Sequence, residues 1–218
     1  MEAPLSKEEL LEKIQNKENV STVNTSKITK MDLLFSFGSF NQPLNKWDVS
    51  NVKDMEGMFF YASQFNQSLN GWDVSKVKTM KSMFYMASCF NHPLNDWDVS
   101  KVKDMESMFN SATSFNQPLN DWDVSKVENM ESMFCSAENF NQPLNDWDVS
   151  NVKNMSGMFN TAKRYIHSFR TWKLKPECKT DDFLENCYLW HMHNTDDNLP
   201  MKNGKRIISE DKTIWNLL

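Results

Sequence analysis

The sequence predicts an α/β solenoid of 25-residue coils with short parallel strands, capped at both ends, and three observations support this fold class. Six tryptophans follow one another at intervals of 25 residues: Trp47, Trp72, Trp97, Trp122, Trp147 and Trp172. The residues around them repeat almost verbatim, without insertion, from residue 40 to residue 164. Apolar side chains recur at fixed positions of the unit, so each copy can bury them only by stacking on its neighbours.

Residues 1–39 form the expected N-terminal cap. Ser6 and Glu9 have the spacing of a capping box ahead of several apolar residues, so we expect a short amphipathic helix that covers the open end of the core. Residues 24–35 then form a degenerate repeat, one residue shorter than the register of the later copies requires.

Residues 40–164 contain five full repeats, each predicted to form a short strand and a helical turn. In the first copy, Trp47 and Val49 alternate with Asp48, as in a strand whose carboxylate points outward. Ser50 follows as a plausible N-cap. The next apolar residues have the i, i+3, i+4, i+7 spacing of one helical face, namely Met55, Met58, Phe59 and Ala62.

Residues 165–218 are predicted to form a degenerate repeat followed by a C-terminal cap or docking segment. Residues 176–218 show no match to the unit. The elements expected there are a helix from Asp181 to about His191, a hairpin at Asn203-Gly204 and a last helix that begins at Ser209. A cap is favoured because an uncapped array exposes an apolar, unpaired edge, whereas Trp190 and Trp215 leave a docking role open.

The repeated unit also resembles a known family. Its pattern Phe-Asn-Gln-Pro-Leu-Asn-x-Trp-Asp-Val-Ser-x-Val-x-x-Met-x-x-Met-Phe is similar to the 25-residue repeat of the BspA-like leucine-rich-repeat proteins, which include the mycoplasma lipoprotein-associated surface proteins. The resemblance covers residues 40–164 and implies a leucine-rich-repeat-like solenoid without enzymatic activity. It implies adhesion or protein binding, often at a surface, and similar repeats also occur in unicellular eukaryotes and large DNA viruses.

Charge and composition bear on the class of partner. The net charge of −5 argues against nucleic-acid binding, because such proteins cluster Lys and Arg to neutralise phosphates. The first residues lack the basic and apolar pattern of a signal peptide, and no run approaches the ~18 apolar residues of a membrane span. We therefore expect no membrane span, and an intracellular or virion-associated protein rather than a secreted one.

Four possible metal ligands occur near the C-terminal end, namely Cys178, Cys187, His191 and His193. Their spacing matches none of the common zinc patterns, and two histidines separated by one residue point in different directions on a helix or strand. We expect packing and surface roles for them, with no metal and no cofactor. No glycine-rich phosphate loop or catalytic nucleophile is indicated either, so neither enzymatic activity nor a small-molecule substrate is expected.

Ladders of acidic residues are the candidate binding site. The first column comprises Asp48, Asp73, Asp98, Asp123 and Asp148, and the run beside it comprises Asp96, Asp121 and Asp146. In-register coils would bring like charges within about 5 Å, where they repel. In one interpretation, each Asp accepts hydrogen bonds from nearby backbone amides or the following serine, and neighbouring lysines screen its charge. In the other, the ladders bind a basic partner or calcium.

The favoured function is a non-catalytic scaffold that binds a protein partner through its sheet face or joins a larger assembly. The alternative is a structural component of a particle, such as a minor virion protein. In that case the C-terminal segment would dock to neighbouring proteins and the repeats would act as a spacer.

Overall fold

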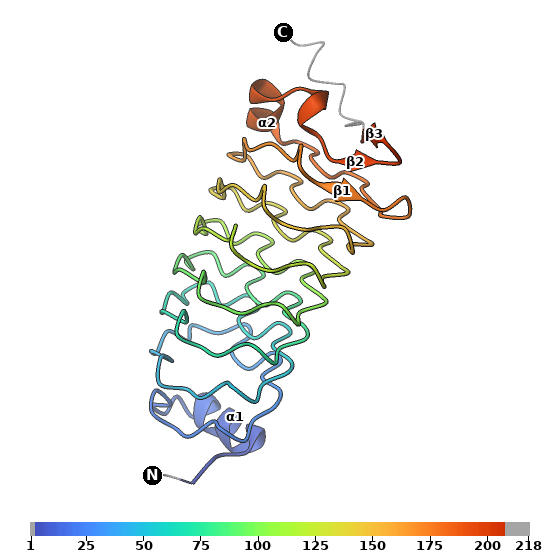
Figure 1. Cartoon of the computed structure of the whole chain (residues 1–218). Coiled ribbons are helices and arrows are strands. Elements are labelled where there is room, and N and C mark those ends of the chain that lie inside the picture. Colours follow the sequence, from blue (N-terminus) through green and yellow to red (C-terminus); the bar gives the residue numbers. More distant parts are fainter. Residues whose placement is uncertain (1–2, 208–218) are drawn as a thin grey trace.

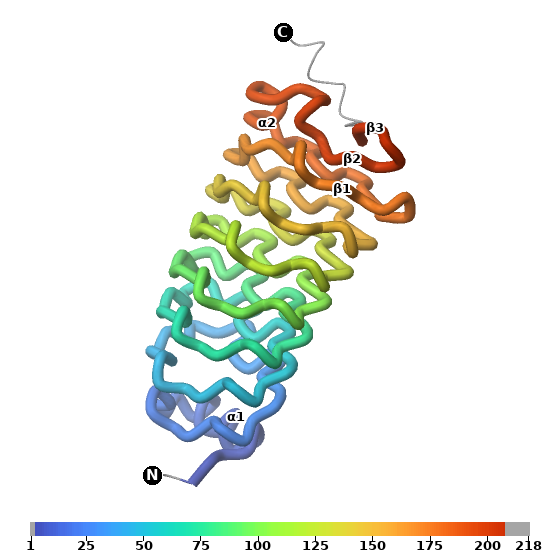
Figure 2. The backbone as a smooth tube through the Cα atoms, in the orientation of Figure 1, coloured from blue at the N-terminus to red at the C-terminus, as the bar shows by residue number. Residues whose placement is uncertain are grey.

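In the computed structural model, residues 3–207 are described, and they form a long stack of coils with the two termini at opposite ends (Figure 1). Figure 2 shows that successive coils follow the same path one above another. The helices and strands lie at the ends: α1 Lys7–Gln15, β1 Lys173–Leu174, α2 Tyr188–His193, the 3-10 helix η1 Asp196–Asn198, β2 Met201–Lys202 and β3 Lys205–Arg206. Among the described residues, no helix is long and apolar enough to cross a membrane.

A ladder of backbone hydrogen bonds joins neighbouring coils. Parallel bridges link Lys30, Asp54, Thr79, Asp104, Asn129, Asn154 and Lys179 in turn. The first interval is one residue shorter than the others, which confirms the register predicted for the degenerate first unit. Beyond each bridge, every second amide donates to the next coil, as the Gly57 amide does to the Lys81 oxygen at 2.8 Å and the Phe59 amide to the Met83 oxygen at 2.9 Å.

The helix expected over residues 55–62 is not formed, and this prediction is wrong. Consecutive turns replace it, in which the Met58 amide donates to the Met55 oxygen and the Ala62 amide to the Phe59 oxygen. The third residue of each turn has a positive φ, as in a type II turn. Two stacked turns present apolar residues at i, i+3, i+4 and i+7 to the core just as a helix would, so the spacing could not distinguish them.

The strand expected around Trp47 and Val49 is not formed in residues 40–164, and only the equivalent residues of the degenerate last copy form one, as β1. The Trp47 amide donates to the Leu44 oxygen at 3.0 Å, and the Val52 amide donates to the Val49 oxygen at 2.8 Å. These bonds stay within one coil and turn the chain. The parallel pairing between coils is instead found at Asp54 and the equivalent residues of later coils.

The core consists of stacked columns of identical side chains. Neighbouring indoles are nearly parallel, as in the pair Trp72 and Trp97, whose rings are 6.5 Å apart and inclined by 1°. A phenylalanine column stacks in the same way, with Phe84 and Phe109 5.6 Å apart. These rings are buried, and truncating a large buried aromatic to alanine costs about 3–5 kcal/mol. Stacked core columns therefore hold the coils in register.

The capping box predicted near the N-terminus is confirmed. Helix α1 begins with the expected capping box, in which the Ser6 hydroxyl accepts from the Glu9 amide and the Glu9 carboxylate accepts from the Ser6 amide. Leu10 on this helix is fully buried against the core. Lys7 ties the helix to the first coil through an ion pair with Asp32 at 2.6 Å.

The coil pattern extends further toward the C-terminus than predicted. Residues 179–187 repeat the stacked turns, with positive φ at Asp182 and Asn186. Phe183 and Leu184 continue the apolar columns of the preceding coil. The expectation that residues 176–218 match nothing in the unit is therefore wrong for residues 179–187, and the helix expected from Asp181 begins only at Tyr188.

A small sheet and α2 cover the last coil. The order is β1-β2-β3, with β1 parallel to β2 and β2 antiparallel to β3. Asn203 and Gly204 connect β2 to β3 with φ of 54° and 72°, which confirms the predicted hairpin and fits a type I′ turn. Trp190 on α2 is buried and donates to the His167 oxygen at 2.8 Å. The helix predicted from Ser209 lies outside the described residues.

Candidate functional site

The first acidic column lies on the surface, where each carboxylate is held by its own turn. All five aspartates are exposed. Each accepts a hydrogen bond of 3.0–3.1 Å from the amide of the serine two residues later, as Asp98 does from Ser100. This is an Asx turn, so Ser50 and its equivalents close turns rather than cap helices. The interpretation in which local backbone groups bind these aspartates is confirmed.

These hydrogen bonds stabilise the charged form of the carboxylates. The Ser100 hydroxyl and amide, together with the nearby Lys101, lower the pKa of Asp98, whereas the charge of Asp123 opposes the shift. The pKa values of Asp73, Asp123 and Asp148 are lowered by their own following serines in the same way. These four aspartates are therefore ionised at neutral pH.

The second acidic run is also exposed, and two of its three members are fixed by the preceding coil. The Asp96 amide donates to Asn70 Oδ1 at 3.1 Å, and Asn70 Nδ2 donates back to the Asp96 carboxylate. The same reciprocal pair joins Asp146 to Asn120. At Asp121 the equivalent asparagine, Asn95, donates instead to Asp96. The structure thus places Asp96 and Asp146 in one geometry and Asp121 in another.

Two lysine columns follow the first aspartate column along each coil. The first comprises Lys76, Lys101 and Lys126, and the charge of Lys101 helps to lower the pKa of Asp98. The second column, two residues further along each coil, comprises Lys53, Lys78, Lys103, Glu128 and Lys153, and its four lysines are exposed. This second column could be predicted from the repeated sequence, because a lysine recurs in four of its five positions. The face is therefore not an acidic strip but a band of opposite charges side by side.

Glu128 interrupts the second lysine column and pairs with the lysines above and below it. Its carboxylate lies 3.0 Å from Lys103 and 2.5 Å from Lys153. Hydrogen bonds from Lys153 and then Lys103 lower the pKa of Glu128 to about 2. A hollow of about 370 Å³ opens beside this group, and it is lined by Lys103, Lys126, Glu128, Asn151, Lys153 and Lys175.

The candidate metal ligands are spread through the C-terminal cap. Cys187 is buried and donates to the Ala162 oxygen at 3.1 Å, and burial raises its pKa to about 12. His193 is exposed, with Nδ1 2.8 Å from the Leu189 oxygen. His191 is buried, and its Nε2 has no hydrogen-bond partner in the structure. Residues 3–207 contain no group of three or more histidine, cysteine or acidic residues arranged to hold a metal ion.

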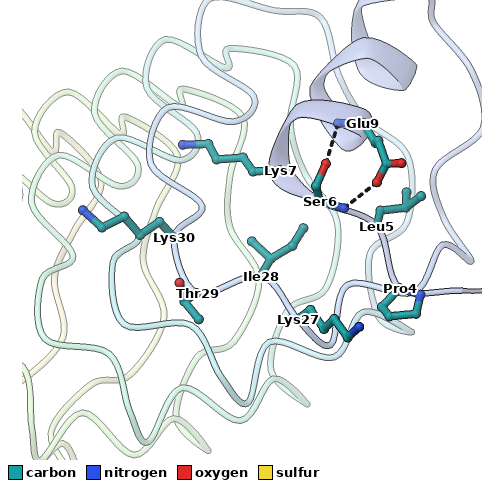
Figure 3. Close-up of a pocket in the computed structure, with 9 residues that line it drawn as sticks. All are labelled: Pro4, Leu5, Ser6, Lys7, Glu9, Lys27, Ile28, Thr29 and Lys30. Carbon is teal, nitrogen blue, oxygen red and sulfur yellow. Dashed lines mark hydrogen bonds between the residues drawn. The ribbon is translucent and has the colours of Figure 1, made fainter.

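A second hollow, of about 490 Å³, lies where α1 meets the first coil (Figure 3). Its walls are Pro4, Leu5, Ser6, Lys7, Glu9, Lys27, Ile28, Thr29 and Lys30. Figure 3 shows Ser6 and Glu9 bound to each other in the capping box at its edge. Lys7 is also engaged, because its ammonium donates to Asp32. Several polar groups of this hollow therefore serve the cap.

Comparison with known families identifies the repeats as part of a wider group. The model of the family described as "Mycoplasma protein of unknown function, DUF285" matches residues 6–112 and again residues 93–197. Together the two matches run from the capping box of α1 into the C-terminal cap. No curated protein and no solved structure matches the chain.

Proposed function

The chain belongs to the family described as Mycoplasma protein of unknown function, DUF285, and from this premise we propose that it is a non-catalytic scaffold that binds a protein partner. Within this family, we propose a leucine-rich-repeat-like architecture of the BspA-like type. The partner binds the face that carries the aspartate and lysine columns. The observation that carries the proposal is the arrangement of these charges in parallel columns along the stack.

Fixed charges favour binding because little conformational freedom is lost when a partner arrives. Each aspartate is already oriented by a serine amide, as Asp123 is by Ser125 at 3.0 Å. The adjacent lysines carry the opposite sign, so the face matches a protein surface that carries parallel acidic and basic stripes. Such complementarity determines register and association rate more than total affinity.

A catalytic role is not proposed for these carboxylates. General acid and base catalysis requires two groups whose environments separate their pKa values. The aspartates of the first column share one environment, with the same serine contact repeated in every coil. They are therefore suited to repeated binding contacts rather than to a reaction.

The test is a charge-neutral variant, Asp98→Asn, Asp123→Asn and Asp148→Asn, used to capture the partner from native cells. The chain contains a natural precedent for it, because Asn24 occupies the aspartate position of the first unit and accepts from the Ser26 amide at 3.2 Å. We therefore expect a variant that still folds, with a modestly lower melting temperature at neutral pH because the charged hydrogen bonds are lost, together with weaker, less salt-dependent capture. Undiminished capture by a folded triple variant would refute the assignment of this face.

A matched set of lysine variants completes the experiment. Replacing Lys76, Lys101 and Lys126 by glutamine removes the basic column next to the aspartates while leaving the Asx turns in place. We expect this variant also to bind more weakly, because the proposed partner contacts both the acidic column and the basic column.

The alternative function, a component of a particle whose C-terminal segment docks to neighbours, stays a prediction. In residues 188–207, α2 and β2 contact the chain's own last coils.

A further inference from the structure

The hollow beside Glu128, which we call the lysine hollow, is lined by charged and amide side chains. Its volume is about 370 Å³, and its lining residues are Lys103, Lys126, Glu128, Asn151, Lys153 and Lys175. The four lysines are exposed. The lining thus combines four ammonium groups with one carboxylate, although the whole chain carries a net charge of −5. A charged group is therefore a better occupant of the lysine hollow than an apolar one.

One trio of residues shows how this surface holds a carboxylate. Lys103, Glu128 and Lys153 lie on three successive coils, and both lysines donate to the carboxylate between them, at 3.0 Å and 2.5 Å. Lys153 and then Lys103 lower the pKa of Glu128 to about 2. The charge of Glu128 is thus compensated from both sides, and lysines two coils apart can bind one carboxylate together.

A second trio has a similar arrangement but no carboxylate at its centre. Lys126, Asn151 and Lys175 also follow one another on successive coils. Lys175 donates to Asn151 Oδ1 at 2.9 Å, and Asn151 Nδ2 donates to the Ser125 oxygen at 2.8 Å. Asn151 is neutral, so it leaves the charges of both lysines uncompensated. An ammonium has three N–H donors, so the bond to Asn151 leaves Lys175 able to donate to a further acceptor.

Asp123 balances part of the positive charge. The Ser125 hydroxyl and amide lower the pKa of Asp123, and the charge of Lys126 adds to this shift. An excess of positive charge remains in the lining after Asp123 and Glu128 are both counted. This excess is small, and the lining contains no arginine and no helix N-terminus, which hold phosphate through several fixed donors. A carboxylate therefore fits the lysine hollow better than a phosphate does.

We propose that the lysine hollow receives an aspartate or glutamate side chain of the protein partner. The partner's carboxylate accepts hydrogen bonds from Lys126 and Lys175. The Glu128 carboxylate is bound in the same way by the lysines on either side of it. This inference rests on the proposed function, because the occupant belongs to the partner of the same face, and it adds the place and the chemistry of one contact. Such a contact fixes the register of the partner along the stack.

The first test measures binding of fluorescein-labelled hexaglutamate by fluorescence anisotropy at low ionic strength. We expect saturable binding by the native chain. Lys126→Gln with Lys175→Gln should weaken binding by about tenfold or more. The matched control, Lys17→Gln with Lys163→Gln, removes the same charge from exposed lysines outside the hollow and should change the affinity by less than about twofold. No binding by the native chain, or equal losses in the two variants, would overturn the proposal.

The second test supplies a carboxylate from within the chain. Asn151→Glu should pair with the lysines of the second trio and weaken hexaglutamate binding by about tenfold or more, without removing a lysine. The equivalent position is lysine in three earlier coils, so the fold does not require asparagine there. The control is Ser63→Glu, which adds the same charge at an exposed position where a later coil has Glu138. The control should bind like the native chain, and a loss in both variants or in neither would overturn the proposal. Circular dichroism establishes that the variants are folded.

Competition distinguishes a carboxylate from a phosphate. At equal ionic strength, we expect acetate and inorganic phosphate to displace hexaglutamate to a similar extent. Displacement by phosphate at roughly a tenth of the acetate concentration or less would overturn the carboxylate assignment and favour a phosphorylated partner.

Capture of the partner from native cells separates this inference from the proposed function. We expect Asn151→Glu to weaken capture. If the triple asparagine variant loses capture but Asn151→Glu does not, the proposed function stands and the carboxylate contact is overturned. If the triple asparagine variant captures the partner normally, the proposed function fails, and hexaglutamate binding still decides whether the lysine hollow binds carboxylates.

Discussion

The indole Nε1 of Trp97 donates a hydrogen bond to the carbonyl oxygen of Leu69, 2.9 Å away in the preceding coil. The same bond recurs from Trp47 to Trp172, at 2.8–3.0 Å. The tryptophan column therefore joins coils in two ways, through stacked rings and through a buried polar contact. This explains why the position is tryptophan in every coil, whereas phenylalanine would supply only the ring.

Two substitutions at Trp97 separate these contributions. Trp97→Phe should cost about 1–2 kcal/mol, because the Leu69 oxygen loses the indole but keeps its bond from the Trp72 amide at 3.0 Å. Trp97→Ala should cost about 3–5 kcal/mol, since it also opens a cavity in the stack. Urea denaturation of both variants measures the difference. Equal losses would show that the hydrogen bond contributes nothing beyond the ring.

A glycine substitution should stabilise the chain at one serine. Ser107 has a φ of 54°, and the equivalent residues Gly57 and Gly157 show that this position accepts glycine. Ser107→Gly should therefore raise the free energy of unfolding by about 0.5–1 kcal/mol, because relief of left-handed strain outweighs the added chain entropy. Ser114→Gly is the control, since Ser114 is not among the residues with positive φ. The Ser114→Gly control should lower the free energy of unfolding. If Ser107→Gly also lowers it, the strain argument is disproved.

The aspartate column should make stability fall in acid. Hydrogen bonds from the following serines lower the pKa of Asp98, Asp123 and Asp148 below their ordinary value of 3.8. Because the folded state holds protons less tightly than the unfolded state, stability is fully present above pH 3.8 and is lost as the pH falls through the folded pKa values. Melting temperatures from neutral to strongly acidic pH should show this loss. The triple asparagine variant should lose less, and an unchanged acid slope would contradict the prediction.

The four cysteines should differ widely in reactivity. Cys89 is exposed, whereas Cys178 and Cys187 are buried, and burial raises their pKa values to about 11 and about 12. The thiolate is the reactive form, so a thiol reagent should modify Cys89 first and reach the two buried cysteines only when the C-terminal cap opens. Mass spectrometry of peptides during labelling measures these rates. Rapid modification of Cys187 in the folded chain would show that the cap is not closed.

The stacked columns of the core could be predicted from the 25-residue period of the sequence. The tryptophan spacing predicted the columns, and the short first unit was confirmed by the bridge between Lys30 and Asp54. The capping box at Ser6 and the hairpin at Asn203 were confirmed because each depends on local chemistry alone. The leucine-rich-repeat-like assignment stays a prediction.

The conformation inside each coil could not be predicted from apolar spacing. Met55 and Phe59 face the core from turns as they would from a helix, and only the positive φ at Gly57 distinguishes the two. Glycine occupies that position in just two of the five full copies, so the sequence signal was weak. The second lysine column could have been predicted, because a lysine recurs at four of its five positions.

The ladder between coils has a consequence for how the chain folds during synthesis. The Gly57 amide bonds to Lys81, and the Trp97 indole bonds to Leu69, so partners are separated by only 24 and 28 positions. A nascent chain can therefore add each coil to the one just completed as it leaves the ribosome, without waiting for distant segments. Helix α1 would be the first template in this process, and the cap around Trp190 would close the growing end last.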